Sequence, residues 1–173
     1  MKTGTVQQIE AMDEFRLLRF FNYFSNILFN KVNADLEQII DLMPGEIKNL
    51  PEMKVVVNQE AKYSKPLEQK EAVDFARTSL RQMAQDDSME PALAEAIKNY
   101  RDDEQPAGVI LALGGAVSFI YLLATSKIIY KNKKWEINLG GNRDPKEIEG
   151  VTNLVKELFN VIPNSILSLV KKN

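Results

Sequence analysis

Apolar side chains recur at steps of three and four along most of the chain, the spacing of amphipathic helices. Residues 5–31 read as one long helix, whose polar first half is partly exposed and whose second half is buried. Asn33 can cap a second helix, which Pro44-Gly45 ends or kinks. The stretch 54–58 reads as a short strand or an extended connection.

A third and a fourth helix follow in the next part of the chain. Ser64 and Pro66 open the third helix, and the polar run 86–88 breaks it. Ser88 is the predicted cap of the fourth helix. The polar stretch 101–106 then marks the best candidate boundary between two parts of the chain. The side chains expected to face inward are Val73, Ala76, Leu80 and Met83 on the third helix and Leu93, Ile97 and Tyr100 on the fourth.

After residue 126 the apolar period changes from that of a helix to that of a strand. Residues 128–130 and 135–139 alternate as two strands, and Asn132-Lys133 forms the tight turn between them. Gly140-Gly141 releases the second strand. The sequence therefore predicts one β-hairpin near the C-terminus, at about 128–139.

The clearest amphipathic helix begins directly after the hairpin. Asp144 is its predicted N-cap, Pro145 takes the first helical position, and Glu147 is the acidic residue three positions after the cap. Pro163 ends this helix, and residues 164–172 can add a short last turn. Its apolar face consists of Ile148, Val151, Val155, Leu158 and Ile162.

Residues 107–126 contain no charged side chain. About 20 residues in a helix match the roughly 30 Å of a bilayer core, and the lysines on the C-terminal side follow the positive-inside rule. However, glycine, serine and threonine make the segment only marginally apolar. The amphipathic helices on both sides also need an apolar element to pack against. We therefore favour a buried central helix over a membrane-inserted segment.

Together these elements predict an α+β fold that is mostly helical. Five or six helices surround the central apolar helix at about 107–126, and one hairpin lies near the C-terminus. We expect a helical region over residues 1–104. Residues 105–173 supply the apolar helix, the hairpin and the amphipathic helix, and they join the first region in one domain.

The composition excludes several kinds of catalytic group but does not identify a function. The 173 residues include no cysteine and no histidine, so disulfides, thiolate nucleophiles and the commonest general base are excluded. The net charge is −2, and it divides into a net −6 in residues 1–106 and a net +4 in residues 107–173. This imbalance is small enough to reflect attraction between the two halves.

The helix at 15–29 is unusually rich in aromatic residues. Its rings do not all fit on one helical face, so the helix needs cover on more than one side. Apolar surface beyond the need of one core is typical of an interaction site. The candidate residues for protein interaction, or alternatively for the core, are Phe15, Phe20, Phe21, Phe24 and Phe29.

The hairpin turn carries the best cluster of basic and aromatic residues. Lys131, Lys133, Lys134 and Trp135 are candidate contacts for an anion or a lipid surface, with Tyr130, Arg143 and Lys146 nearby. Cations beside stacking rings can hold single-stranded nucleic acid, but one hairpin in an acidic chain favours a solvated turn instead.

Other motifs give no site. The turn 139–145 contains two glycines but lacks a phosphate-loop pattern, and Asp144 would repel an anion there. The acidic groups at 86–90 and 102–104 lack the alternating spacing of a calcium loop. We therefore predict no catalytic residue, no metal and no cofactor.

By exclusion, the sequence favours a non-enzymatic protein–protein interaction or assembly module that binds another protein or itself. The alternative is a membrane-inserting protein, single-pass or pore-forming, that uses residues 107–126. Nucleic acid is disfavoured as a partner. No apolar run follows Lys2, as it would in a signal peptide, so we expect the cytoplasm, with a membrane as the alternative location.

Overall fold

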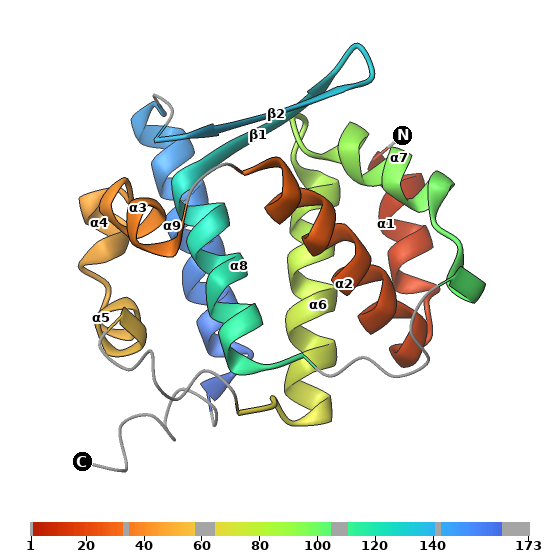
Figure 1. The fold of residues 1–173 in the computed structure, drawn as a ribbon, viewed down its shortest axis with the longest axis horizontal. Helices are drawn as coiled ribbons and strands as arrows, with labels where there is room; N and C mark the ends of the chain where they lie inside the picture. The colour runs from red at the N-terminus through yellow and green to blue at the C-terminus, as the bar shows by residue number, and fades with distance from the viewer. Residues whose placement is uncertain (1, 33–34, 58–64, 105–110, 141–142, 164–173) are drawn as a thin grey trace.

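The computed structural model describes residues 2–32, 35–57, 65–104, 111–140 and 143–163. Figure 1 shows a mostly helical fold with a two-stranded hairpin lying across one end of the helices. The predicted α+β class is therefore confirmed. The first half contains α1 (Lys2–Glu10), α2 (Glu14–Lys31), α3 (Leu36–Asp41), α4 (Gly45–Lys48), α5 (Pro51–Val57) and α6 (Gln69–Gln85). The second half contains α7 (Glu90–Asn99), the 3₁₀-helix η2 (Asp102–Glu104), α8 (Leu113–Thr125), β1 (Ser126–Lys131), β2 (Lys134–Leu139) and α9 (Pro145–Asn160).

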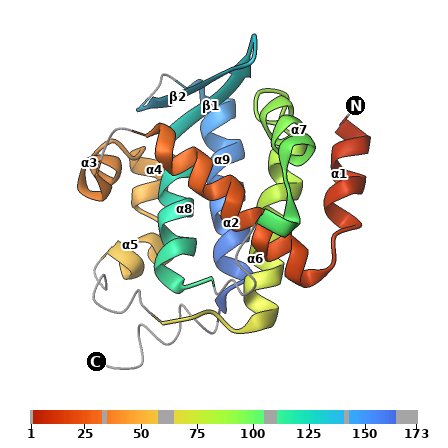
Figure 2. The same cartoon turned by 45° about the vertical axis from the view of Figure 1, so that its right-hand side comes forward.

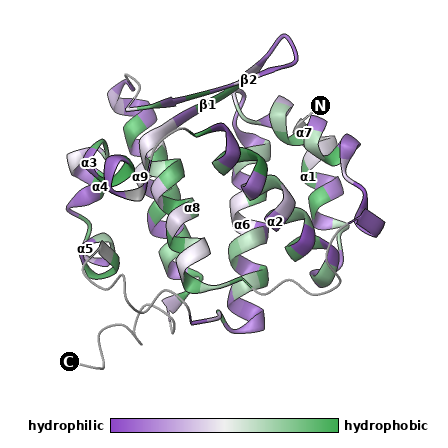
Figure 3. Cartoon of the chain, in the orientation of Figure 1, coloured by the Kyte–Doolittle hydropathy of each residue, from purple (hydrophilic) through white to green (hydrophobic). Residues whose placement is uncertain are grey.

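Helix α8 lies at the centre of the fold, as predicted, but it is shorter than the apolar run. It begins at Leu113 and gives way to β1 at Ser126, while residues 107–110 fall outside the described residues. Figure 1 shows α2 crossing in front of α6 beside α8, with α9 behind α8 and α3 at its side, and Figure 2 shows the same arrangement from another side. Figure 3 shows α8 as largely hydrophobic and the hairpin tip as hydrophilic.

Buried aromatic rings connect the central helix α8 to α2 and α6. The ring of Phe119 on α8 lies 4.9 Å from that of Phe21 on α2 and 6.3 Å from that of Phe75 on α6, measured between centroids. These rings belong to one hydrophobic core that draws side chains from both regions of the chain. Among the described residues, no helix combines the length and the apolar character needed to cross a membrane.

The long helix predicted over residues 5–31 is two helices. The chain turns at Ala11–Asp13, and the side chain of Asp13 accepts a hydrogen bond from the backbone N–H of Arg16, which caps α2. The guanidinium of Arg77 on α6 donates to the carbonyl oxygens of Ile9 and Met12 and so holds the turn. The prediction was wrong because the apolar spacing continues across the break.

The segment between α2 and α6 also differs from the prediction. Asp35, rather than Asn33, caps α3, through a capping box with Gln38. This helix ends at Asp41, before the predicted break at Pro44-Gly45, and Pro44 is the N-cap of α4. The predicted strand or extended connection at 54–58 is wrong, because residues 51–57 form α5. The fold therefore has more helices than the five or six expected.

Two of the predicted helix starts needed correction as well. Pro66 forms an isolated bridge with Ala112, and α6 begins only at Gln69; Ser64 is outside the described residues. Ser88 does not cap α7. Instead, the carboxylate of Asp86 accepts hydrogen bonds from the N–H groups of Ser88 and Met89. The predicted inward seam of α6 is confirmed, since all four of its residues are buried: Val73, Ala76, Leu80 and Met83.

The hairpin and the last described helix match the prediction closely. In the antiparallel register, Tyr130 is opposite Trp135 and Lys131 is opposite Lys134. Asp144 caps α9 by accepting a hydrogen bond from the N–H of Glu147 at 2.8 Å, with Pro145 at the first position. The short last turn expected at 164–172 is outside the described part of the chain.

Candidate interaction surface

The aromatic residues predicted for protein interaction mostly build the core. Phe20, Phe21 and Phe24 are buried. The ring of Phe20 meets that of Tyr100 edge-on at 5.2 Å, and Phe24 lies 5.9 Å from Trp135. These three rings stabilise the fold and offer no surface to a partner.

The two remaining phenylalanines lie at opposite ends of α2. Phe15, in the first turn, is 67% exposed, whereas Phe29, in the last turn, is half-buried and packs against the core. A single exposed ring is common on protein surfaces. Of the five phenylalanines predicted for interaction, Phe15 alone is exposed.

The rings beside the hairpin turn face the body of the protein. Residues alternate between the two faces of the hairpin, and the face that carries Tyr130 and Trp135 also carries the buried Ile128. The rings of Tyr130 and Trp135 meet at 5.4 Å, and Trp135 continues to Phe24 on α2. The aromatic part of the predicted cluster therefore fixes the hairpin to the helices, and both rings are half-buried.

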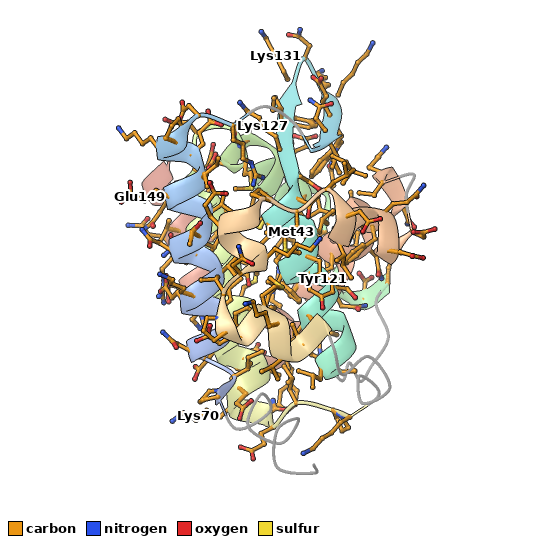
Figure 4. The ribbon with its side chains drawn as sticks, turned by 90° about the vertical axis from the view of Figure 1, so that its left-hand side faces the viewer. Met43, Lys70, Tyr121, Lys127, Lys131 and Glu149 are labelled. Carbon is orange, nitrogen blue, oxygen red and sulfur yellow. The ribbon has the colours of Figure 1, made fainter. Side chains whose placement is uncertain are left out.

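The basic part of the cluster points the other way. Lys131, Lys133 and Lys134 are exposed at the end of the hairpin, and we name these three residues the lysine tip. Figure 4 shows Lys131 at the far end, directed away from the body, with Lys127 closer to the helices. The ammonium group of Lys127 lies 3.5 Å from a carboxylate oxygen of Glu147, so this lysine forms an ion pair between β1 and α9.

The residues of the lysine tip destabilise the hairpin locally. Lys133 has a φ of 60° and Asn132 a φ of 55°, the left-handed pair that a tight hairpin turn requires. Glycine is favoured at the second of these positions because a side chain is strained there. Lys131 and Lys134 are also directly opposite each other, where like charges destabilise a strand pair. Three cations thus occupy positions where local stability favours other residues.

Arg143 does not belong to the basic surface. Its guanidinium donates to the carbonyl oxygens of Leu123, Ala124 and Ser126, where α8 ends and β1 begins. Burial lowers the pKa of Arg143, and the carboxylates of Glu147 and Asp86 oppose that effect. No sequence signal marks this role, because it depends on where the end of α8 lies in space.

The polar stretch predicted as a boundary contains an anchored charge cluster. The guanidinium of Arg19 binds the carboxylate of Asp102 through two hydrogen bonds of 2.8 Å, and the hydroxyl of Tyr100 donates to the same carboxylate at 2.7 Å. Hydrogen bonds from Arg19 and Tyr100 lower the pKa of Asp102 to about 2. Desolvation, with the hydrogen bond to Asp102, raises the pKa of Tyr100 to about 12. The cluster attaches η2 to α2.

The acidic groups considered for a cation have structural partners. Asp86 accepts hydrogen bonds from the backbone of the turn before α7, and Asp102 is paired with Arg19. Within the ranges described above, no group of carboxylates is arranged to hold a metal ion. The glycine turn considered for phosphate is described only in part. Gly140 has a φ of 64°, and Gly141 lies outside the described residues. The side chain of Asp144 occupies the N-terminus of α9, next to this turn.

Comparison of the chain with models of known protein families, with curated proteins and with solved structures gave no match.

Proposed function

We propose that this chain is a non-enzymatic interaction protein whose lysine tip binds an acidic surface of a partner protein. The observation that supports the proposal is the cost described above: Lys133 adopts a left-handed conformation and Lys131 is opposite Lys134. Residues that violate local stability rules tend to occur at functional sites. Here the violation places three exposed cations together on a projecting hairpin.

The chemistry around the tip favours a protein partner over nucleic acid. The rings of Tyr130 and Trp135 contact each other, and Trp135 also contacts Phe24, so little of their ring surface is left for stacking on bases. The chain as a whole carries a net charge of −2, which opposes binding to a long polyanion. A compact acidic patch on a protein needs only the three cations of the tip.

The same chemistry favours a protein over an anionic membrane. Residues 131–134 are lysine, asparagine, lysine and lysine, so the tip itself offers no apolar side chain for insertion among lipids. Lysines alone would give weak, salt-sensitive attachment to a bilayer. The lack of cysteine fits a reducing compartment, and we place the proposed interaction in the cytoplasm.

The first test measures binding of a fluorescently labelled oligoglutamate peptide by anisotropy, at low and at physiological salt. The variant Lys131→Gln/Lys133→Gln/Lys134→Gln removes the tip. We expect its affinity for the peptide to fall by about tenfold at low salt, the sum of three exposed ion pairs.

A matched control removes three exposed lysines elsewhere, as Lys70→Gln/Lys98→Gln/Lys156→Gln. It has the same net charge as the tip variant, and we expect it to lose less than about twofold. An equal loss in both triple variants would show only a net-charge effect and refute the proposal. Tighter binding to a single-stranded oligonucleotide or to phosphatidylserine vesicles than to the peptide would also refute it.

A further inference from the structure

A groove of about 470 Å³ opens between α2, α3 and α8. Phe29 on α2 and Ile39 on α3 contribute apolar surface to it. Asn22 and Asn26, one helical turn apart on α2, line it on one side, and Ser118 on α8 lines it too. Its volume falls in the range of pockets that enclose small organic molecules.

The described residues that line the groove carry no charge. Every described residue that lines it is apolar, an amide, a hydroxyl or glycine. Among the described residues, none forms a hydrogen bond with the side-chain amides of Asn22 and Asn26 or with the hydroxyl of Ser118. An amide both donates and accepts, so the groove can satisfy a neutral polar group on an otherwise apolar molecule. A charged ligand would find no counter-charge among these described residues.

Gly115 keeps the groove open where packing does not require glycine. A Cβ atom built on Gly115 would meet the nearest atom, Cδ1 of Leu111, at 3.4 Å, which is an ordinary contact. Among the described residues, Gly115 is not one of those with a positive φ. Alanine would therefore fit and would favour the helix. What the glycine provides is free space, since the residue is exposed and lines the groove.

We propose that this groove binds a small, uncharged, mainly apolar organic molecule that carries at least one hydrogen-bonding group. The apolar walls cover its body, and the two asparagines with Ser118 bind its polar group. This site lies on α2, α3 and α8, apart from the lysine tip, so it does not depend on the proposed protein interaction.

The test uses two dyes with the same ring skeleton. N-phenyl-1-naphthylamine is neutral, whereas 8-anilinonaphthalene-1-sulfonate carries a sulfonate. Fluorescence titration of the full chain should show saturable binding of the neutral dye at one site, with the sulfonate dye at least about tenfold weaker. Lack of saturable binding of the neutral dye, or equal affinity for both dyes, would overturn the proposal.

Variants locate the binding. Gly115→Leu fills the groove and should weaken binding of the neutral dye by at least about tenfold. Gly150→Leu makes the same change on the exposed face of α9, where a Cβ would meet nothing within 4 Å, and should leave binding unchanged. Unchanged binding in Gly115→Leu, or the same loss in Gly150→Leu, would contradict the assignment.

Asn26→Asp covers the case in which Gly115→Leu disturbs folding. Asn26 is exposed, so its substitution leaves the core intact, yet it places a carboxylate beside the ligand. We expect weaker binding of the neutral dye with an unchanged circular dichroism spectrum. Wild-type affinity in Asn26→Asp would overturn the placement of the ligand between α2 and α8.

Discussion

The guanidinium Nη1 of Arg143 donates to the carbonyl oxygen of Ala124 at 2.9 Å, and Nη2 donates to that of Leu123 at 3.1 Å. The last carbonyl groups of a helix have no partner within it, and a cation there also complements the helix dipole. Arg143 therefore caps the C-terminal end of α8 with a side chain from another segment of the chain. It does so from the residue before the cap of α9, so one side chain joins α8 to α9.

Arg143→Ala should lower the free energy of unfolding by about 2 to 4 kcal/mol, because it leaves several carbonyl groups of the α8–β1 junction without a donor. Urea denaturation followed by circular dichroism measures the loss. Arg143→Lys keeps the charge but lacks the planar fork, so it should recover only part of it. Lys146→Ala, an exposed change nearby, should stay within about 0.5 kcal/mol of the wild type.

Phe24→Ala should destabilise the protein by about 3 to 5 kcal/mol, since its ring is fully buried beside Trp135. Phe15→Ala, the same change at the exposed end of α2, should cost less than about 0.5 kcal/mol. Thermal or urea unfolding compares the two. Equal effects would contradict the division of these phenylalanines into core and surface.

Stability at acid pH should depend on Asp102. Its folded pKa of about 2 is below the ordinary value of 3.8, so the carboxylate stabilises the fold above pH 4 and loses this contribution as the pH falls toward 2. The difference in unfolding free energy between the wild type and Asp102→Asn should therefore shrink over that range. Parallel curves for the two proteins between pH 5 and pH 2 would contradict the prediction.

Lys133→Gly should stabilise the hairpin by about 0.5 to 1 kcal/mol, because glycine adopts the left-handed conformation without strain. The same substitution should weaken binding of the oligoglutamate peptide, since it removes one cation of the lysine tip. Lys156→Gly, in the exposed interior of α9, should instead lose about 1 kcal/mol. A loss of stability in Lys133→Gly would remove the cost on which the proposed function rests.

The elements that the sequence predicted well are those with local signals. Asp144, Pro145 and Glu147 start α9 within four residues, and the two-residue turn at Asn132-Lys133 fixes the register of the strands. The buried seam of α6 followed from helical spacing alone. In each case the decisive contacts lie within a few residues of one another.

Some errors came from local cap signals that apolar spacing does not show, and others from contacts between distant residues. Apolar spacing runs unbroken from α1 into α2, although Asp13 before Glu14 was a cap signal that could have located the break. The β-branched run 55–57 suggested a strand, yet burial of Met53 and Val56 on one helical face makes it α5.

The candidate site could be predicted in part, because some of its features depend on the local sequence and others on contacts between distant residues. The lysine tip lies in a turn, so its exposure followed from the local sequence. The direction of Trp135 depends on Phe24, which is far away along the chain, and the groove depends on how α2 crosses α8. Neither could be read from spacing.

The ring contacts of Phe21 also bear on how the protein is made. Its partner on α6, Phe75, and its partner on α8, Phe119, come much later in the chain. A ribosome builds the chain from its N-terminus, so α2 emerges with its aromatic face uncovered, and that face is not fully covered until α8 has been synthesised. For most of its synthesis the nascent chain therefore displays the kind of surface that chaperones bind.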